Sequence, residues 1–170
     1  MNFNELFSVA PFILGPKLEN KDDKTLGYPL LIRGQHGIGK SEAVRQIADV
    51  YGLELVERRA SQMSEGDLIG LPKLADGCTK WLPPDWVLQA CQQPVVLFLD
   101  ELDRAFKEVR QGFFQLADSR EIAGHKLHPG TKLIAAINGG QFGKDYQVYK
   151  MGEAEKDRWT IYDFEPSKED

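Results

Sequence analysis

Short apolar runs alternate with amphipathic stretches along this chain, and the alternation predicts an α/β fold built on a mainly parallel sheet. Residues 94–99 form the clearest buried strand, because their apolar run is continuous and β-branched at its start. Further strands are predicted at residues 28–33, 132–137 and 159–164. Residues 53–57 alternate only in part, which predicts a fifth strand nearer an edge of the sheet.

Two stretches carry apolar side chains at helical spacing. The first predicts a helix over residues 41–51, directly after the first strand. The second predicts a helix that begins directly after residues 94–101. The apolar faces of the two helices consist of Val44, Ile47, Ala48 and Tyr51, and of Leu102, Phe106, Val109, Phe113 and Leu116.

Two insertions interrupt the alternation. Residues 63–85 contain glycines and prolines that exclude a long helix. Within them, residues 71–74 and 79–82 flank the turn-forming pair Asp76-Gly77, which predicts a β-hairpin. Residues 121–127 predict a second hairpin around Ala123-Gly124. Both insertions are either surface decoration or elements that contact a partner.

Composition limits the class of protein. The 170 residues suggest one domain, and 28% charged with 42% hydrophobic residues is typical of soluble globular proteins. The net charge of −5 provides no general attraction for nucleic acid or anionic lipid. No segment has the features of a signal peptide or a membrane span. We expect a cytoplasmic protein whose two cysteines, Cys78 and Cys91, are reduced.

The most informative stretch is a phosphate-binding loop between the first strand and the first helix. It follows the pattern G-x-x-x-x-G-K-S, and this strand–loop–helix context is the one the pattern requires. Glycines let the backbone approach phosphate oxygens, Lys40 supplies a charge for the β- and γ-phosphates, and Ser41 offers a hydroxyl to Mg²⁺. The predicted nucleotide-binding residues are Gly34, Gln35, His36, Gly37, Ile38, Gly39, Lys40 and Ser41.

Two carboxylates end the clearest buried strand. Asp100 and Glu101 follow the apolar run, at the edge where ligands bind in open α/β sheets. Asp100 can hold Mg²⁺ with Ser41, and Glu101 can act as a general base that polarises the attacking water. Together with the phosphate loop, the pair predicts nucleotide hydrolysis.

Three further polar residues are candidates for the site. Asn138 ends the strand at 132–137, where an amide could orient water, although an asparagine before a glycine pair is also an ordinary turn residue. Arg158 precedes the last strand and Arg104 follows the carboxylate pair. Either arginine could equally form a surface ion pair.

These motifs resemble those of AAA+ ATPases and, within them, of the MoxR-like group that carries a helix-2 insert. The matching segments occur in family order across nearly the whole chain. They are GQHGIGKS at 34–41, EGDLIGLP at 65–72, VLFLDELDRA at 96–105, IAAIN at 134–138 and DRW at 157–159.

The resemblance implies a P-loop NTPase fold, a three-layer sandwich around a five-stranded sheet, which binds ATP or ADP with Mg²⁺. It implies that Asp100 belongs to the metal site, that Glu101 is the catalytic base and that Asn138 is the sensor-1 amide. Arg158 matches the arginine finger that reaches the nucleotide of a neighbouring subunit, and Arg104 matches a residue of the subunit interface. The two insertions match elements that face the central pore or the substrate.

The implied partners are further copies of the chain, in a ring with hexamer as the expected size, and a client or adaptor protein such as a von Willebrand factor A protein. Two features depart from the family pattern. Residues 138–140 read Asn-Gly-Gly where the family has Asn-Pro, and the chain ends at Asp170, where the family continues into a helical lid. We therefore expect one domain over residues 1–170, with the lid absent or truncated and with slow turnover in isolation.

Two other function classes fit part of the sequence. A nucleic-acid motor could use His125, Lys126 and His128 near one hairpin and Lys73 and Lys80 in the other, although the negative net charge disfavours it. A small-molecule P-loop kinase would need an acceptor pocket, whereas Asp100-Glu101 with Asn138 suits a water nucleophile better.

Overall fold

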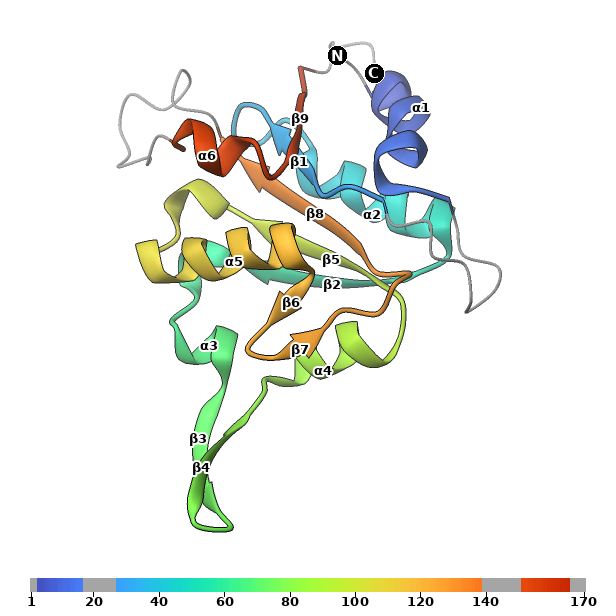
Figure 1. Cartoon of the computed structure of the whole chain (residues 1–170). Coiled ribbons are helices and arrows are strands. Elements are labelled where there is room, and N and C mark those ends of the chain that lie inside the picture. Colours follow the sequence, from blue (N-terminus) through green and yellow to red (C-terminus); the bar gives the residue numbers. More distant parts are fainter. Residues whose placement is uncertain (1–2, 17–26, 139–150, 166–170) are drawn as a thin grey trace.

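The fold is centred on a five-stranded sheet in a computed structural model that describes residues 3–16, 27–138 and 151–165 (Figure 1). The strand order is β2-β5-β8-β1-β9, and all four pairings are parallel. The predicted five-stranded parallel sheet is thus confirmed, with the partly alternating strand β2 at an edge. The strands are β2 (Glu54–Arg59), β5 (Val95–Asp100), β8 (Lys132–Ile137), β1 (Leu30–Arg33) and β9 (Thr160–Asp163).

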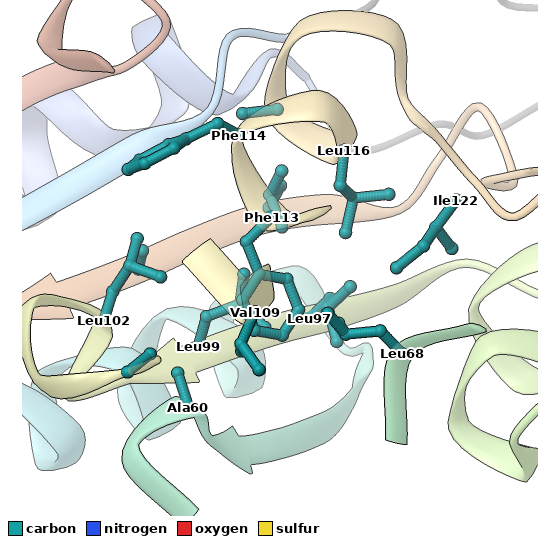
Figure 2. Packing of buried hydrophobic residues seen from close by; sticks show 14 of the residues in the cluster. Ala60, Leu68, Leu97, Leu99, Leu102, Val109, Phe113, Phe114, Leu116 and Ile122 are labelled. Carbon is teal, nitrogen blue, oxygen red and sulfur yellow. The ribbon is translucent and has the colours of Figure 1, made fainter. Parts of the chain in front are cut away.

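Helices cover both faces of the sheet and make three layers. One hydrophobic cluster joins α1 (Phe3–Leu14) and α2 (Lys40–Tyr51) to one face, and a second joins α4 (Asp85–Gln92) and α5 (Lys107–Ser119) to the other. Side chains of a parallel strand are buried on both faces, which explains the continuous apolar runs of β5 and β8. Figure 2 shows the second cluster, where Phe113 and Val109 of α5 pack over Leu97 and Leu99 of β5.

The segment after β5 corrects one sequence prediction. Leu102 lies in a single 3-10 turn (Leu102–Arg104), and α5 begins only at Lys107. Ala105 and Phe106 between them are extended, and Phe106 is 69% exposed. The prediction of one continuous helix was therefore wrong in its first turn, because Leu102 reaches the core from the 3-10 turn while fitting a helical spacing. Helices α1 and α4 were not predicted.

Helix α1 is attached near both ends of α2. At the loop end, the ring of Phe3 lies so close that a Cβ atom added to Gly39 would be 3.1 Å from it. At the other end, the hydroxyl of Tyr51 donates to the carbonyl of Gly15 at 2.6 Å, and the buried ammonium of Lys132 donates to the carbonyls of Leu14 and Pro16 at 2.8 and 2.9 Å. A cation at these carbonyls satisfies the C-terminal end of the helix.

Both predicted hairpins are present. The first pairs β3 (Leu71–Ala75) with β4 (Cys78–Leu82) and extends away from the sheet (Figure 1). The second pairs β6 (Glu121–Ile122) with β7 (His125–Lys126) between α5 and β8. Both cysteines are free thiols, as the sequence predicted. In the part of the chain described, no helix has the length and apolar character needed to cross a membrane.

The base of the long hairpin is anchored in the core, although its strands are exposed. Leu68 of the short helix α3 (Gly66–Ile69) packs against α5, and the indole N–H of Trp86 donates to the carbonyl of Asp67 at 2.9 Å (Figure 2 for Leu68). Gly70 follows α3 with φ +85°, and a Cβ atom there would lie 1.8 Å from the carbonyl oxygen of Leu82. Only glycine fits this backbone crossing.

Replacing Gly70 by alanine should therefore loosen the hairpin base. We expect Gly70→Ala to lower the free energy of unfolding by about 1–3 kcal/mol, because both backbone strain and a clash with Leu82 must be relieved. Gly77→Ala is the matched control, since Gly77 has φ +75° in the same hairpin but open space around it. Urea unfolding and amide exchange of β3 and β4 measure the difference. Equal effects of both substitutions would contradict the close packing at Gly70.

Candidate functional site

The carboxyl ends of β1, β5 and β8 bring the predicted site residues other than Arg158 to one edge of the sheet. After β1 the phosphate loop turns into α2, with Gly37 and Gly39 at φ +79° and +94°. A Cβ atom on Gly34 would lie 2.4 Å from the carbonyl oxygen of Phe164, so the loop packs tightly against the end of the sheet. The glycines of the motif are thus required by local geometry as well as by phosphate access.

The side chain of Lys40 connects the loop to β8. Its ammonium group is buried and donates to the carbonyls of Gly34 and Gln35 at 2.8 and 2.9 Å and to Oδ1 of Asn138 at 3.0 Å. Burial lowers the pKa of Lys40, and the nearby carboxylates, led by Asp100, oppose that shift. Hydrogen bonds to a charged group contribute roughly 1.5–3 kcal/mol each, so three of them can offset much of the burial cost.

Asp100 and Ser41 supply oxygen atoms to the same point of the cleft. The hydroxyl of Ser41 donates to Oδ2 of Asp100 at 3.4 Å, a long contact that leaves both oxygens available to a third atom. A hydroxyl, a carboxylate and phosphate oxygens are the donors that Mg²⁺ prefers, with water completing its shell. The residues present therefore fit Mg²⁺ bound together with a nucleotide. Among the described residues, no group of three or more His, Cys, Asp or Glu side chains could hold a metal alone.

Glu101 adopts a strained backbone conformation beside Asp100. Its φ is +54°, a left-handed value that is uncommon for a side chain other than glycine. Its carboxylate accepts a short hydrogen bond from the hydroxyl of Ser61 and lies 3.7 Å from the guanidinium of Arg104. The side chain is thus held between two groups, and its carboxylate keeps lone pairs that can accept a hydrogen bond from a water in the cleft.

Asn138 is fixed by its backbone as well as its side chain. Its amide N–H donates to Oδ2 of Asp103 at 3.0 Å, while its side-chain oxygen accepts from Lys40. Asn138 is buried, and its Nδ2 makes no hydrogen bond within the described residues. A buried donor of this kind requires an acceptor, which a phosphate oxygen or an ordered water would supply.

These groups line one open cleft of about 390 Å³. The predicted site residues that line this cleft are His36, Gly37, Gly39, Lys40 and Ser41 of the phosphate loop, together with Asp100, Glu101 and Asn138. The sequence analysis missed Glu42, Arg59 and the neighbouring Ser61. Arg59 lies at the carboxyl end of β2 and pairs in register with Asp100, whereas the strand predicted at residues 53–57 stops before it.

Arg158 lies apart from this cleft. It precedes β9, whose first residue, Thr160, pairs with Leu30 at the start of β1, so Arg158 is near the amino ends of the strands. Its guanidinium donates to the carbonyl of Ala154 at 2.9 Å and is 3.9 Å from a carboxylate oxygen of Asp118. A partly exposed ion pair of that length contributes only about 0–1 kcal/mol, so the arginine can be drawn to another anion.

Comparisons with known proteins identify the family. Residues 29–158 match the model of the AAA domain, dynein-related subfamily. Midasin from Giardia intestinalis is 33% identical over 93 residues, which cover 54% of this chain and 2% of midasin. A mutant of RuvB from Thermotoga maritima has a similar fold, with a TM-score of 0.60 and 16% identity over 95% of this chain and 44% of that one.

The fold and the cleft define a P-loop nucleotide-binding protein of the AAA+ class. The chain belongs to the AAA domain family, dynein-related subfamily, because the family model covers most of its length. It spans only a small part of midasin and less than half of RuvB, so the similarity concerns this domain alone.

Proposed function

We propose that this domain binds ATP with Mg²⁺ and hydrolyses it at the boundary between subunits of a ring, as in MoxR-like proteins, to remodel a partner protein. The observation that carries the proposal is the meeting of Lys40, Asp100, Glu101 and Asn138 around one cleft. A phosphate-binding loop alone would support nucleotide binding. The added carboxylate pair and amide supply what hydrolysis by water needs.

Each residue of the cleft has a chemical role in this proposal. Lys40 would exchange its carbonyl contacts for the β- and γ-phosphate oxygens. Ser41 and Asp100 would hold Mg²⁺, which would supply positive charge beside the phosphates. Glu101 accepts a proton from the attacking water. Asn138 donates its free N–H to that water or to the γ-phosphate.

Arg158 completes the site of a neighbouring subunit in this proposal. Its place near the amino ends of the strands, away from the cleft of its own chain, suits a group that acts on another copy. Its partner Asp118 is exposed and the ion pair between them is long, so breaking the pair costs little. An arginine at the γ-phosphate stabilises transition-state charge and can contribute about 10³–10⁵ in rate.

The long hairpin is the proposed contact with the partner protein. Leu74 and Trp81 on one face are 84% and 49% exposed, which makes the hairpin an apolar surface held away from the core. Lys80 on the opposite face is paired with Asp76 at 2.6 Å, which reduces its attraction for nucleic acid. These features favour a protein partner, for which a von Willebrand factor A protein or another client of MoxR-like ATPases is a candidate.

Replacing Glu101 by glutamine tests the hydrolytic role. We expect Glu101→Gln to bind fluorescent ATP with affinity within about threefold of the original chain but to lower phosphate release at least about 100-fold, because the amide cannot accept the proton. Lys40→Ala is the comparison variant and should lose nucleotide binding itself. Hydrolysis that survives in Glu101→Gln would remove this residue as the base.

Mixing two inactive variants tests the role of Arg158 across a subunit boundary. Arg158→Ala lacks the arginine and Lys40→Ala lacks nucleotide binding, so neither alone should hydrolyse ATP. A one-to-one mixture should recover up to about a quarter of the original rate, because random assembly places an intact arginine beside an intact cleft at that frequency. Asp118→Ala keeps the guanidinium and should remain active. A mixture without recovery would contradict action between subunits.

Polar substitution on the hairpin tests the partner surface. A reduced, carboxymethylated and fluorescein-labelled globular protein serves as an unfolded probe, and its binding is followed by fluorescence anisotropy with ATP in the Glu101→Gln background. Leu74→Ser with Trp81→Ser should weaken binding about tenfold or more, since large aromatic side chains, tryptophan above all, carry much of the binding free energy of such contacts. Val50→Ser on α2 is the matched control. Equal weakening in the control would reject the hairpin as the contact.

A further inference from the structure

Asp103 is a buried carboxylate that the proposed chemistry does not use. It lies in the 3-10 turn after β5 and is 2% exposed, and no salt bridge to it is found among the described residues, which is rare for an aspartate buried so deeply. Its Oδ2 accepts the backbone N–H of Asn138 at 3.0 Å. Burial raises the pKa of Asp103, while hydrogen bonds from the backbone N–H groups of Asn138 and of Asp103 itself, together with the charges of Arg104 and Lys40, act against that rise.

This hydrogen bond extends the link between β5 and β8 beyond their last paired residues, Leu99 and Ala135. The turn holding Asp103 continues from Asp100 and Glu101, and Asn138 continues from β8. The side-chain oxygen of Asn138 is in turn bound by Lys40. A continuous path of hydrogen bonds therefore runs from Asp103 through Asn138 to the ammonium group of the phosphate loop.

We propose that Asp103 is a positioning residue, whose carboxylate fixes the backbone at Asn138 and so aims the amide side chain between Lys40 and the cleft. The inference rests on the proposed hydrolysis for its kinetic consequence but not for its structural one. Because Oδ1 of Asn138 binds Lys40, the orientation of the amide plane is set and so is the direction in which its NH₂ group points. Loss of the acceptor at Asp103 releases the backbone of Asn138, and its side-chain amide is then no longer held in that orientation.

A pair of substitutions separates the hydrogen bond from the charge. Asp103→Asn keeps an oxygen that can accept the N–H of Asn138, whereas Asp103→Ala removes the acceptor and leaves a buried N–H without a partner. Thr131→Val is the matched control, because Thr131 is equally buried, precedes the amino end of the same strand β8 and donates to the carbonyl of Ala90 at 3.0 Å. The valine loses this bond and the longer contacts of the hydroxyl with the N–H of Val95 and the carbonyl of Gln93, all far from the cleft.

The kinetic measurement is ATP turnover of the full chain, with ADP affinity determined separately. We expect Asp103→Ala to lower kcat about 10- to 100-fold, the usual effect of losing an orienting partner, with ADP affinity within about threefold of the original chain. Asp103→Asn should recover most of kcat, and Thr131→Val should match the original chain. Asp103→Asn as slow as Asp103→Ala, or Asp103→Ala as fast as the original chain, would overturn the inference.

Hydrogen exchange of the Asn138 amide gives a readout that does not depend on hydrolysis. In the nucleotide-free chain the amide should be protected in the original chain and in Asp103→Asn, and it should exchange at least about tenfold faster in Asp103→Ala. If the original chain shows no turnover, the proposed function fails while this arm still decides the structural inference. Equal protection in all three chains would overturn it.

Discussion

The parallel pairing of β1, β5 and β8 is the constraint on which the site depends. Parallel strands in register end at a common edge, so segments that are distant in the sequence meet where their strands stop. The phosphate loop, the carboxylate pair and Asn138 are delivered in this way, each at the end of a strand or directly after it. The helical layers hold the sheet together from both faces, and the remaining contacts of the cleft refine positions that the pairing has already set.

Electrostatics in the cleft is arranged for a ligand that carries several negative charges. The buried ammonium group of Lys40 is stabilised by carbonyl and amide oxygens, which are neutral acceptors that phosphate oxygens can replace. The carboxylates nearby are placed to share a cation with those phosphates, and without one they would repel the ligand. In the proposed function, this arrangement would couple binding of the nucleotide to binding of Mg²⁺.

The sheet and most of the cleft could be predicted because their signals are local. Continuous apolar runs identify buried strands, and the phosphate loop has a fixed spacing of glycines, lysine and serine. Ser61, Arg59 and the environment of Asp103 could not be predicted in the same way, because their roles arise from β2 and the 3-10 turn lying next to particular neighbours in space. The first turn after β5 was mistaken for helix since Leu102 and Phe106 also fit a period of 3.6. Helix α1 has apolar residues on several sides, including an exposed Phe12, and so carries a weak periodic signal.

Polar contacts hold strand β8 at both of its ends. Lys132 at its start caps α1, and Asn138 after its end binds Lys40 and Asp103. A slip of one residue along the sheet would break both attachments and turn every apolar side chain of the strand toward the opposite layer. The strand is thus fixed in position between α1 and the cleft. Any movement around the cleft must therefore take place in the loops and helices next to β8, since the strand itself is held at both ends.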